Sequence, residues 1–179
     1  MYRPRLPGLA LATALLAACG HGGGDHSGAM SAFRHLTIAD SGDVMVHARN
    51  GSKARITATG DLYIEGKSIT TTAAERELLQ DYHSGAVALR RDAIATGKAG
   101  MDTGIHALGA VAKGLASGNP DSIDSEVNSR AKKVDALADA VCQDLARLYA
   151  DQGKVAAAIP AFHPYATIEP REVSECGGD

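Results

Sequence analysis

Three cysteines and seven histidines are the side chains of this 179-residue chain that could support covalent or metal chemistry. Cys142 and Cys176 are candidates for a disulfide, because paired cysteines are common in oxidising compartments. The alternatives are two free thiols, with Cys142 a small buried hydrophobe, or a nucleophilic Cys142 thiolate assisted by a histidine. The sequence shows no orienting group for such a thiolate. We therefore favour the disulfide, which would hold the C-terminal segment against a helix.

The histidine spacing does not indicate a metal site. His83 and His106 are 23 residues apart, and neither has a His or Cys four positions away. His21, Asp25 and His26 lie in a glycine-rich stretch without rigid geometry. The sequence also has no G-x-S-x-G motif, glycine-rich phosphate loop or H-E-x-x-H motif. We therefore expect no catalytic residue, no metal and no cofactor.

The remaining cysteine, Cys19, follows a segment with the features of an export signal. Arg3 and Arg5 precede an apolar run, residues 8–18, which is too short to span a bilayer. The stretch Leu16-Ala17-Ala18-Cys19 is similar to the bacterial lipobox. That resemblance implies diacylation of the Cys19 thiol, cleavage before Cys19 and acylation of the new amino group. The alternative is an ordinary secreted protein with a chance cysteine.

Residues 1–18 are therefore expected to be a lipoprotein signal peptide. Acyl chains on Cys19 would hold the protein on a lipid bilayer without a spanning helix. Gly20 stands where retention at the inner membrane usually requires Asp, so the resemblance implies the inner leaflet of the outer membrane, with the domain in the periplasm. Residues 19–32 are rich in glycine and are expected to form a lipidated, flexible tether.

Composition favours one small folded domain. Apolar residues make up 45% and charged residues 22% of the chain, close to ordinary globular values. A net charge of −3 argues against a nucleic-acid partner, because phosphate binding requires a basic face. We expect residues 33–170 to form a single α+β domain, followed by a flexible tail at 171–179.

Residues 35–70 alternate short apolar segments with turn signals, which predicts an antiparallel β-meander. Asn50-Gly51 favours a two-residue type I′ turn, which would set Met45 opposite Ile56. Further turns are predicted at Ser41-Gly42, Thr59-Gly60-Asp61 and Glu65-Gly66. Together the turns predict one apolar face: Leu36, Ile38, Met45, Ile56, Ala58, Leu62, Ile64 and Ile69. His47 is expected beside Leu36 on that face, and Val44 and Val46 on the other.

Two antiparallel helices, at about 72–117 and 120–152, are predicted to cover this face. Thr72 and Glu75 match a capping box, and Asn119-Pro120 favours a second helix start. Apolar residues from Val127 to Leu148 follow a coiled-coil spacing. The first helix has an eleven-residue pattern: Ala86, Leu89, Ala93, Gly97, Gly100, Gly104, Leu108, Val111 and Leu115.

The three central glycines of that pattern, Gly97, Gly100 and Gly104, are expected to allow close packing against another backbone. The alternative is a break in the helix near residues 98–102. Beyond the helices, residues 154–170 are expected to form an irregular tail, because their prolines exclude a helix. Phe162, Tyr165 and Ile168 are expected to pack this tail onto the helices.

The segment from His35 to Lys67, with Thr72-Ala73-Ala74-Glu75-Arg76 and Cys142-Gln143-Asp144-Leu145, resembles the YggN-type family of proteobacterial envelope proteins, a domain of unknown function. The resemblance implies an exported protein without an assigned catalytic residue. The lipobox departs from members that look merely periplasmic. We expect a non-catalytic interaction or structural protein that binds an envelope protein or forms a homodimer. The alternative is a carrier module for a lipid, a small molecule or a metal.

Overall fold

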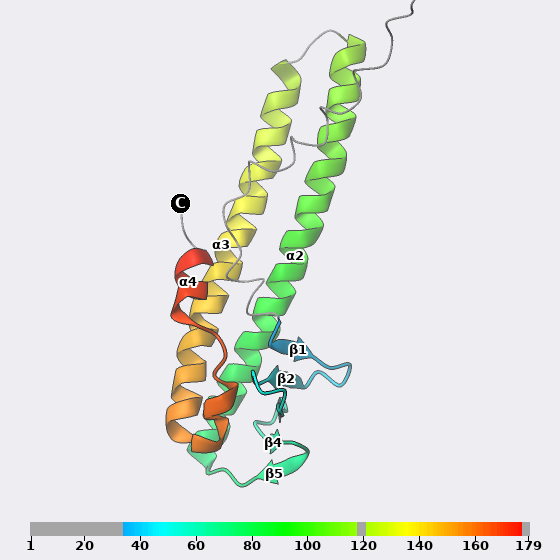
Figure 1. Cartoon of the computed structure of the whole chain (residues 1–179). Coiled ribbons are helices and arrows are strands. Elements are labelled where there is room, and N and C mark those ends of the chain that lie inside the picture. Colours follow the sequence, from blue (N-terminus) through cyan, green and yellow to red (C-terminus); the bar gives the residue numbers. More distant parts are fainter. Residues whose placement is uncertain (1–33, 118–120, 177–179) are drawn as a thin grey trace, which may run out of the picture.

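The computed structural model describes residues 34–117 and 121–176, and it confirms the predicted α+β class (Figure 1). A five-stranded antiparallel meander in the order β1-β2-β3-β4-β5 packs against the lower part of a long helix pair. The elements are β1 (Leu36–Ile38), β2 (Val44–His47), β3 (Lys53–Ile56), β4 (Leu62–Ile64), β5 (Lys67–Ile69), α2 (Ala73–Ser117), α3 (Asp121–Ala158), the 3₁₀-helix η1 (Pro160–Tyr165) and α4 (Pro170–Cys176). The predicted signal peptide, Cys19 and tether lie outside the described residues.

Three of the four strand connections share one loop geometry. In each, the last of three loop residues is a glycine with positive φ: Gly42 at +88°, Gly51 at +85° and Gly60 at +78°. The second loop is closed by two backbone hydrogen bonds of 2.9 Å, from Gly51 N to Ala48 O and from Ala48 N to Ser52 O. This is a type I turn followed by a left-handed residue. The prediction of a two-residue turn at Asn50-Gly51 is therefore wrong.

The extra loop residue shifts the predicted register of β2 by one residue. Val44 pairs with Ile56, not Met45, and Val46 pairs with both Leu36 and Ala54. Because side chains alternate along a strand, this shift exchanges the two faces. Val44 and Val46 are fully buried, whereas Met45 and His47 lie on the opposite face. The predicted faces of β2 are thus wrong, and the native register gives the core two β-branched side chains.

The other two turns leave the predicted faces intact. The loop between β3 and β4 is residues 58–60, so Ile56 pairs with Leu62, a shift of two residues, and Ala58 is exposed in the loop. The last turn is confirmed: Glu65 and Gly66 have φ of 49° and 76°, and Leu62 pairs with Ile69. Both φ values are positive, as a type I′ turn requires.

The first long helix begins with the predicted capping box. The Thr72 amide donates to Glu75 Oε2 at 2.6 Å, and the Glu75 amide donates to Thr72 Oγ1 at 3.3 Å. The helix α2 then continues to Ser117, so the alternative of a break near residues 98–102 is wrong. The helix α3 runs beyond its predicted end to Ala158, because Gly153 is tolerated in an exposed position and Pro160 follows only about two turns later.

The predicted close packing of Gly97, Gly100 and Gly104 is wrong within residues 34–117 and 121–176. All three are exposed, and a Cβ added at any of them would meet no described atom within 4 Å. The buried and half-buried side of α2 instead follows a seven-residue spacing at Leu89, Thr96, Thr103 and Ala110, and it also includes Ala86, Ala93 and Ala107 on either side of the exposed Gly100. A heptad pattern on the partner helix α3 favours a left-handed supercoil, which keeps a seven-residue seam on α2 and moves Gly97 and Gly104 outward.

The C-terminal segment is more ordered than predicted. Phe162, Tyr165 and Ile168 are buried as expected, and the Phe162 ring lies edge-on to Tyr82 at a centroid distance of 5.6 Å. However, residues 160–165 form a 3₁₀-helix and residues 170–176 form α4, so the predictions of an irregular tail and a flexible end are wrong there. Each helix begins with proline, where a missing amide hydrogen costs nothing. Residues 177–179 lie outside the described part.

The disulfide between Cys142 and Cys176 is present and joins α3 to α4, with the two Cα atoms 5.4 Å apart. It holds α4 in the orientation that buries Glu172 and Cys176. The hydroxyl of Tyr165 also donates to Ser52 Oγ at 3.0 Å, which connects η1 to the sheet. The C-terminal segment therefore turns at η1 and packs back along α3, with α4 beside its middle part (Figure 1).

Candidate functional site

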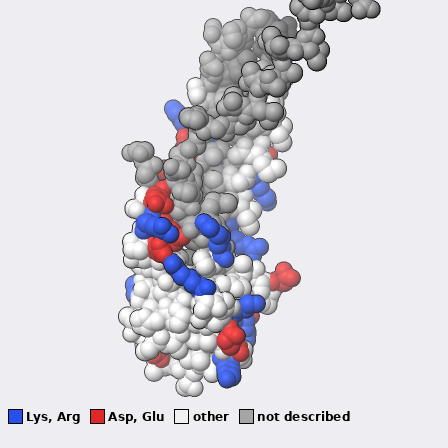
Figure 2. Space-filling model, in the orientation of Figure 1, with Lys and Arg blue, Asp and Glu red and all other residues white. Residues whose placement is uncertain are grey.

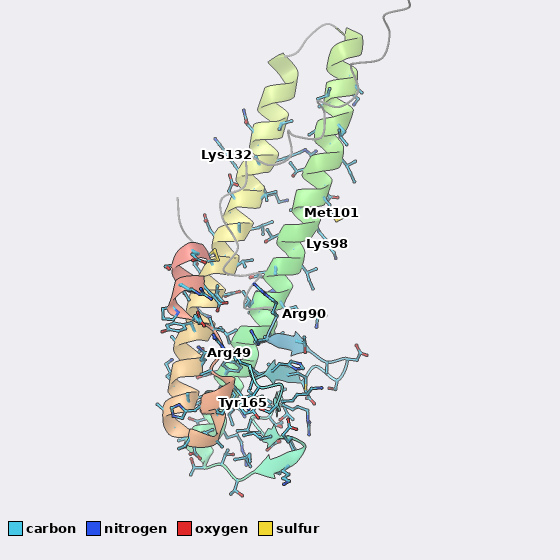
Figure 3. All side chains as sticks on the ribbon, viewed as in Figure 1. Arg49, Arg90, Lys98, Met101, Lys132 and Tyr165 are labelled. Carbon is cyan, nitrogen blue, oxygen red and sulfur yellow. A yellow bond between two sulfur atoms is a disulfide. The ribbon has the colours of Figure 1, made fainter. Side chains whose placement is uncertain are left out.

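The side of α2 opposite its buried seam carries six large apolar side chains that remain exposed. We call this set the outer face: Val87, Ile94, Met101, Ile105, Leu108 and Val111. Met101 and Leu108 are 70% and 75% exposed. Figure 3 shows Met101 on the side of α2 that points away from α3. Single exposed apolar side chains are normal on a protein surface. A group of them on one face more often marks a surface that binds another molecule.

The outer face has its own periodicity. Val87, Ile94, Met101 and Leu108 are spaced by seven residues, and so are Gly97, Gly104 and Val111. Large side chains therefore alternate with two positions that have no side chain, Gly97 and Gly104. In coiled coils, such large side chains insert between the residues of a facing helix, and small residues let the two backbones approach. The glycines predicted as packing positions are thus on the exposed face, where they can contact only another molecule or a residue outside the described part.

A groove of about 500 Å³ lies where the outer face meets the sheet. It is lined by Ile38, Val87, Arg90, Arg91, Ile94, Ala95 and Lys98. Arg90 Nη1 donates to the backbone oxygen of Ile38 at 3.0 Å, which joins α2 to the edge strand β1. Arg91 donates to the neighbouring Asp92 at 2.7 Å. The groove therefore combines an apolar surface with three cations, and no carboxylate is among its described lining residues.

The histidines do not converge on this groove. His83 is buried, with Nε2 2.9 Å from the backbone oxygen of Gly42, so it has a structural partner. His47 lies on the outer side of the sheet rather than beside Leu36, and His106 is exposed on α2. In the described part of the chain, no group of three or more His, Cys, Asp and Glu side chains could hold a metal ion. The disulfide leaves no free thiol at Cys142 in this structure.

A pair of carboxylates between the long helices was missed in the sequence. Burial raises the pKa of Asp144 on α3, and the carboxylate of Asp92 on α2 raises it further. In contrast, the hydrogen bond from Arg91 is the main effect that lowers the pKa of Asp92. Asp144 Oδ2 is buried and has no hydrogen-bond partner among the described residues. Neither carboxylate lines the groove, so we interpret the pair as part of the helix contact.

Comparisons with protein families, with curated proteins and with solved structures find no match to this chain. The resemblance to the YggN-type family therefore stays a prediction. No helix within residues 34–117 and 121–176 is long and apolar enough to cross a membrane. Lipidation of Cys19 also stays a prediction, because that residue lies outside the described part.

Proposed function

We propose that this chain is a non-catalytic, lipid-anchored protein of the bacterial envelope that associates with a second copy of itself through α2. The anchor is the acylated Cys19, which would place the domain on the periplasmic side of the outer membrane. The association uses the distal part of the outer face, Met101, Ile105, Leu108 and Val111. The observation that carries this proposal is that these side chains are between 50% and 75% exposed.

A second copy is favoured because the surface has a helical repeat. An apolar seam with seven-residue spacing packs best against a helix with the same spacing. The outer face of another α2 provides that spacing, with large side chains to place against Gly97 and Gly104 of its partner. We therefore expect a symmetric dimer in which the same surface of both copies is buried.

The expected energy explains why the anchor matters. Burying the exposed half of a large aliphatic side chain contributes about 1 kcal/mol, so four such residues on each of two copies contribute about 8 kcal/mol. Loss of translational and rotational freedom opposes association by about 4–15 kcal/mol. Dimerisation in free solution is therefore expected to be weak. Two copies anchored in one leaflet meet at a much higher effective concentration, which favours the dimer.

The anchor is tested by the mass and processing of the protein in its native cells. We expect the mature protein to begin at Cys19 and to carry three acyl chains, according to the lipobox chemistry. Globomycin, which inhibits the lipoprotein signal peptidase, should cause the precursor to accumulate. A Cys19→Ser variant should leave the membrane or accumulate unprocessed. If globomycin has no effect and Cys19→Ser is processed and located as before, the proposed anchor is wrong.

The dimer is tested by cysteine crosslinking in intact cells. Met101→Cys should give a reducible dimer, whereas Lys132→Cys, an exposed position on α3, should not (Figure 3). Adding Leu108→Glu to Met101→Cys should remove most of the dimer, because a carboxylate would be buried in the apolar seam. Equal crosslinking at positions 101 and 132, or none at 101, would contradict self-association through the outer face.

A further inference from the structure

The charge of the groove between β1 and α2 differs from that of the chain. The chain has a net charge of −3, yet the titratable groups that line this groove are Arg90, Arg91 and Lys98. Asp92 offsets the charge of Arg91, but no ion pair within the described residues offsets Arg90 or Lys98. Figure 2 shows Lys and Arg side chains over the middle of this face, with Asp and Glu side chains beside some of them, and Figure 3 labels Arg90 and Lys98 along α2. The groove therefore favours an anionic group.

The rest of the lining is apolar, which restricts the kind of anion. Ile38, Val87, Ile94 and Ala95 complete the groove, and Ile94 is 48% exposed. A free phosphate would contact the cations and leave this apolar surface in water. A molecule with an anionic head and a hydrocarbon chain would use both, since burying apolar area is itself favourable.

The edge of the sheet extends the groove. Among the described strands, β1 pairs only with β2 and so forms an edge of the sheet. A second hollow of about 320 Å³ runs along it, lined by Leu36, Thr37, Ile38 and Arg90. The two hollows share Ile38 and Arg90, so they form one continuous surface. Arg90 is held at their junction by its hydrogen bond to Ile38, which orients its guanidinium without a competing carboxylate.

The groove also lies close to the point where the chain leaves the described domain. Ile38 is four residues after Arg34, and the proposed anchor Cys19 is a further fifteen residues away. Fifteen residues span at most about 50 Å when fully extended. The groove therefore remains within reach of the leaflet that holds the anchor.

We propose that the groove formed by β1 and the proximal part of α2 binds one anionic phospholipid, with its phosphate at Arg90 and Lys98 and an acyl chain along Ile38, Val87 and Ile94. That the lipid comes from the leaflet rests on the proposed anchor. The ability of the groove to bind an anionic lipid does not depend on that anchor. The lining of this groove contains none of the residues proposed for self-association, although Gly97 precedes Lys98 directly in the chain.

The test uses the mature protein purified from its native envelope in mild detergent. Dioleoylphosphatidylglycerol is the anionic probe, dioleoylphosphatidylcholine is the zwitterionic probe with the same chains, and inorganic phosphate represents the head group alone. Native mass spectrometry counts bound lipid, and acetylation of the Lys98 amine reports occupancy of the groove. We expect one phosphatidylglycerol per chain and slower acetylation of Lys98, whereas Lys132 should react at an unchanged rate.

Matched variants separate the groove from general charge effects. Lys98→Gln should weaken phosphatidylglycerol binding about fivefold, the effect of losing one partly exposed ion pair. Lys132→Gln removes the same charge from α3 and should leave the affinity unchanged. Equal binding of both lipids, protection of Lys98 by inorganic phosphate alone, or equal effects of the two variants would overturn the proposal. The intact mass in the same spectra reports acylation of Cys19 separately, so failure of the anchor and failure of the groove are distinguishable.

Discussion

The side-chain amide of Gln152 pairs with the backbone of Ile168 through both of its polar atoms. Gln152 Nε2 donates to Ile168 O at 2.7 Å, and the Ile168 amide donates to Gln152 Oε1 at 3.0 Å. Both residues are buried, so the side chain satisfies two backbone groups that have left regular secondary structure. This pair holds the segment between η1 and α4 against α3.

We expect Gln152→Ala to lower the free energy of unfolding by about 2–3 kcal/mol, because it leaves the buried amide and carbonyl of Ile168 without partners. Urea denaturation of the purified protein measures the change. Gln143→Ala is the matched control, since Gln143 is an exposed glutamine on the same helix. Equal stability of the two variants would show that the paired hydrogen bonds contribute little.

Reduction of the Cys142–Cys176 disulfide should lower stability and release α4. The bond closes a loop with a sequence separation of 34, for which chain-entropy arguments give about 3–4 kcal/mol. Thermal unfolding with and without reductant measures the loss. The double variant Cys142→Ala/Cys176→Ala should unfold at the reduced protein's lower temperature and no longer respond to reductant. An unchanged melting temperature in the reduced wild type would contradict a stabilising role.

Alanine substitutions at two glycines should have opposite effects. At Gly60, φ is +78° and a Cβ would overlap the carbonyl oxygen and Cγ of Arg76, so Gly60→Ala should cost about 2–4 kcal/mol. At Gly104 a Cβ would meet nothing within 4 Å, so Gly104→Ala should stabilise the helix by about 1 kcal/mol. Denaturant midpoints at low protein concentration compare the two. Destabilisation by Gly104→Ala would indicate a contact at that position.

Asp144→Asn should stabilise the protein at neutral pH. Burial and Asp92 hold the pKa of Asp144 above its usual value, while Arg147 and Arg91 partly oppose that rise. A raised carboxyl pKa means that the folded state binds the proton of Asp144 more tightly than the unfolded state does. The protonated carboxyl therefore favours folding at low pH, and this contribution is lost as the pH rises through the raised pKa.

The expected gain at neutral pH is below about 1 kcal/mol, because solvent screens this partly exposed pair. It should disappear under acidic conditions, where wild-type Asp144 is protonated. Asp92 has the opposite effect. Its pKa is lowered, so its ionised form stabilises the folded state, and this stabilisation is lost as the pH falls. Asp139→Asn, at an exposed position on the same helix, is the control for the change in net charge. Equal gains from both variants across the pH range would contradict the Asp92–Asp144 interaction.

Local chemistry determined most of the elements. Asp or Asn residues and glycines marked the turns of the meander, and Thr72 with Glu75 marked the start of α2, because these signals act through contacts only three residues apart. The number of strands and the helix pair were therefore predictable. The Cys142–Cys176 bond was predicted on other grounds, since these are the two cysteines left beside Cys19 and paired cysteines are common in oxidising compartments. The N-terminal pattern at Cys19 is also local, and it alone supports the proposed location.

Tertiary packing decided which residues face one another. The register of β2 depends on one loop residue. The native register buries Val44 and Val46 in place of Met45, and this advantage exists only when the whole sheet is assembled. The exposed position of Gly97 and Gly104 likewise depends on how α2 winds around α3, since a small change in helical period moves distant residues to another face. The Asp92–Asp144 pair and the groove beside Ile38 arise from the same packing. Their residues are far apart in the chain, and no local signal links them.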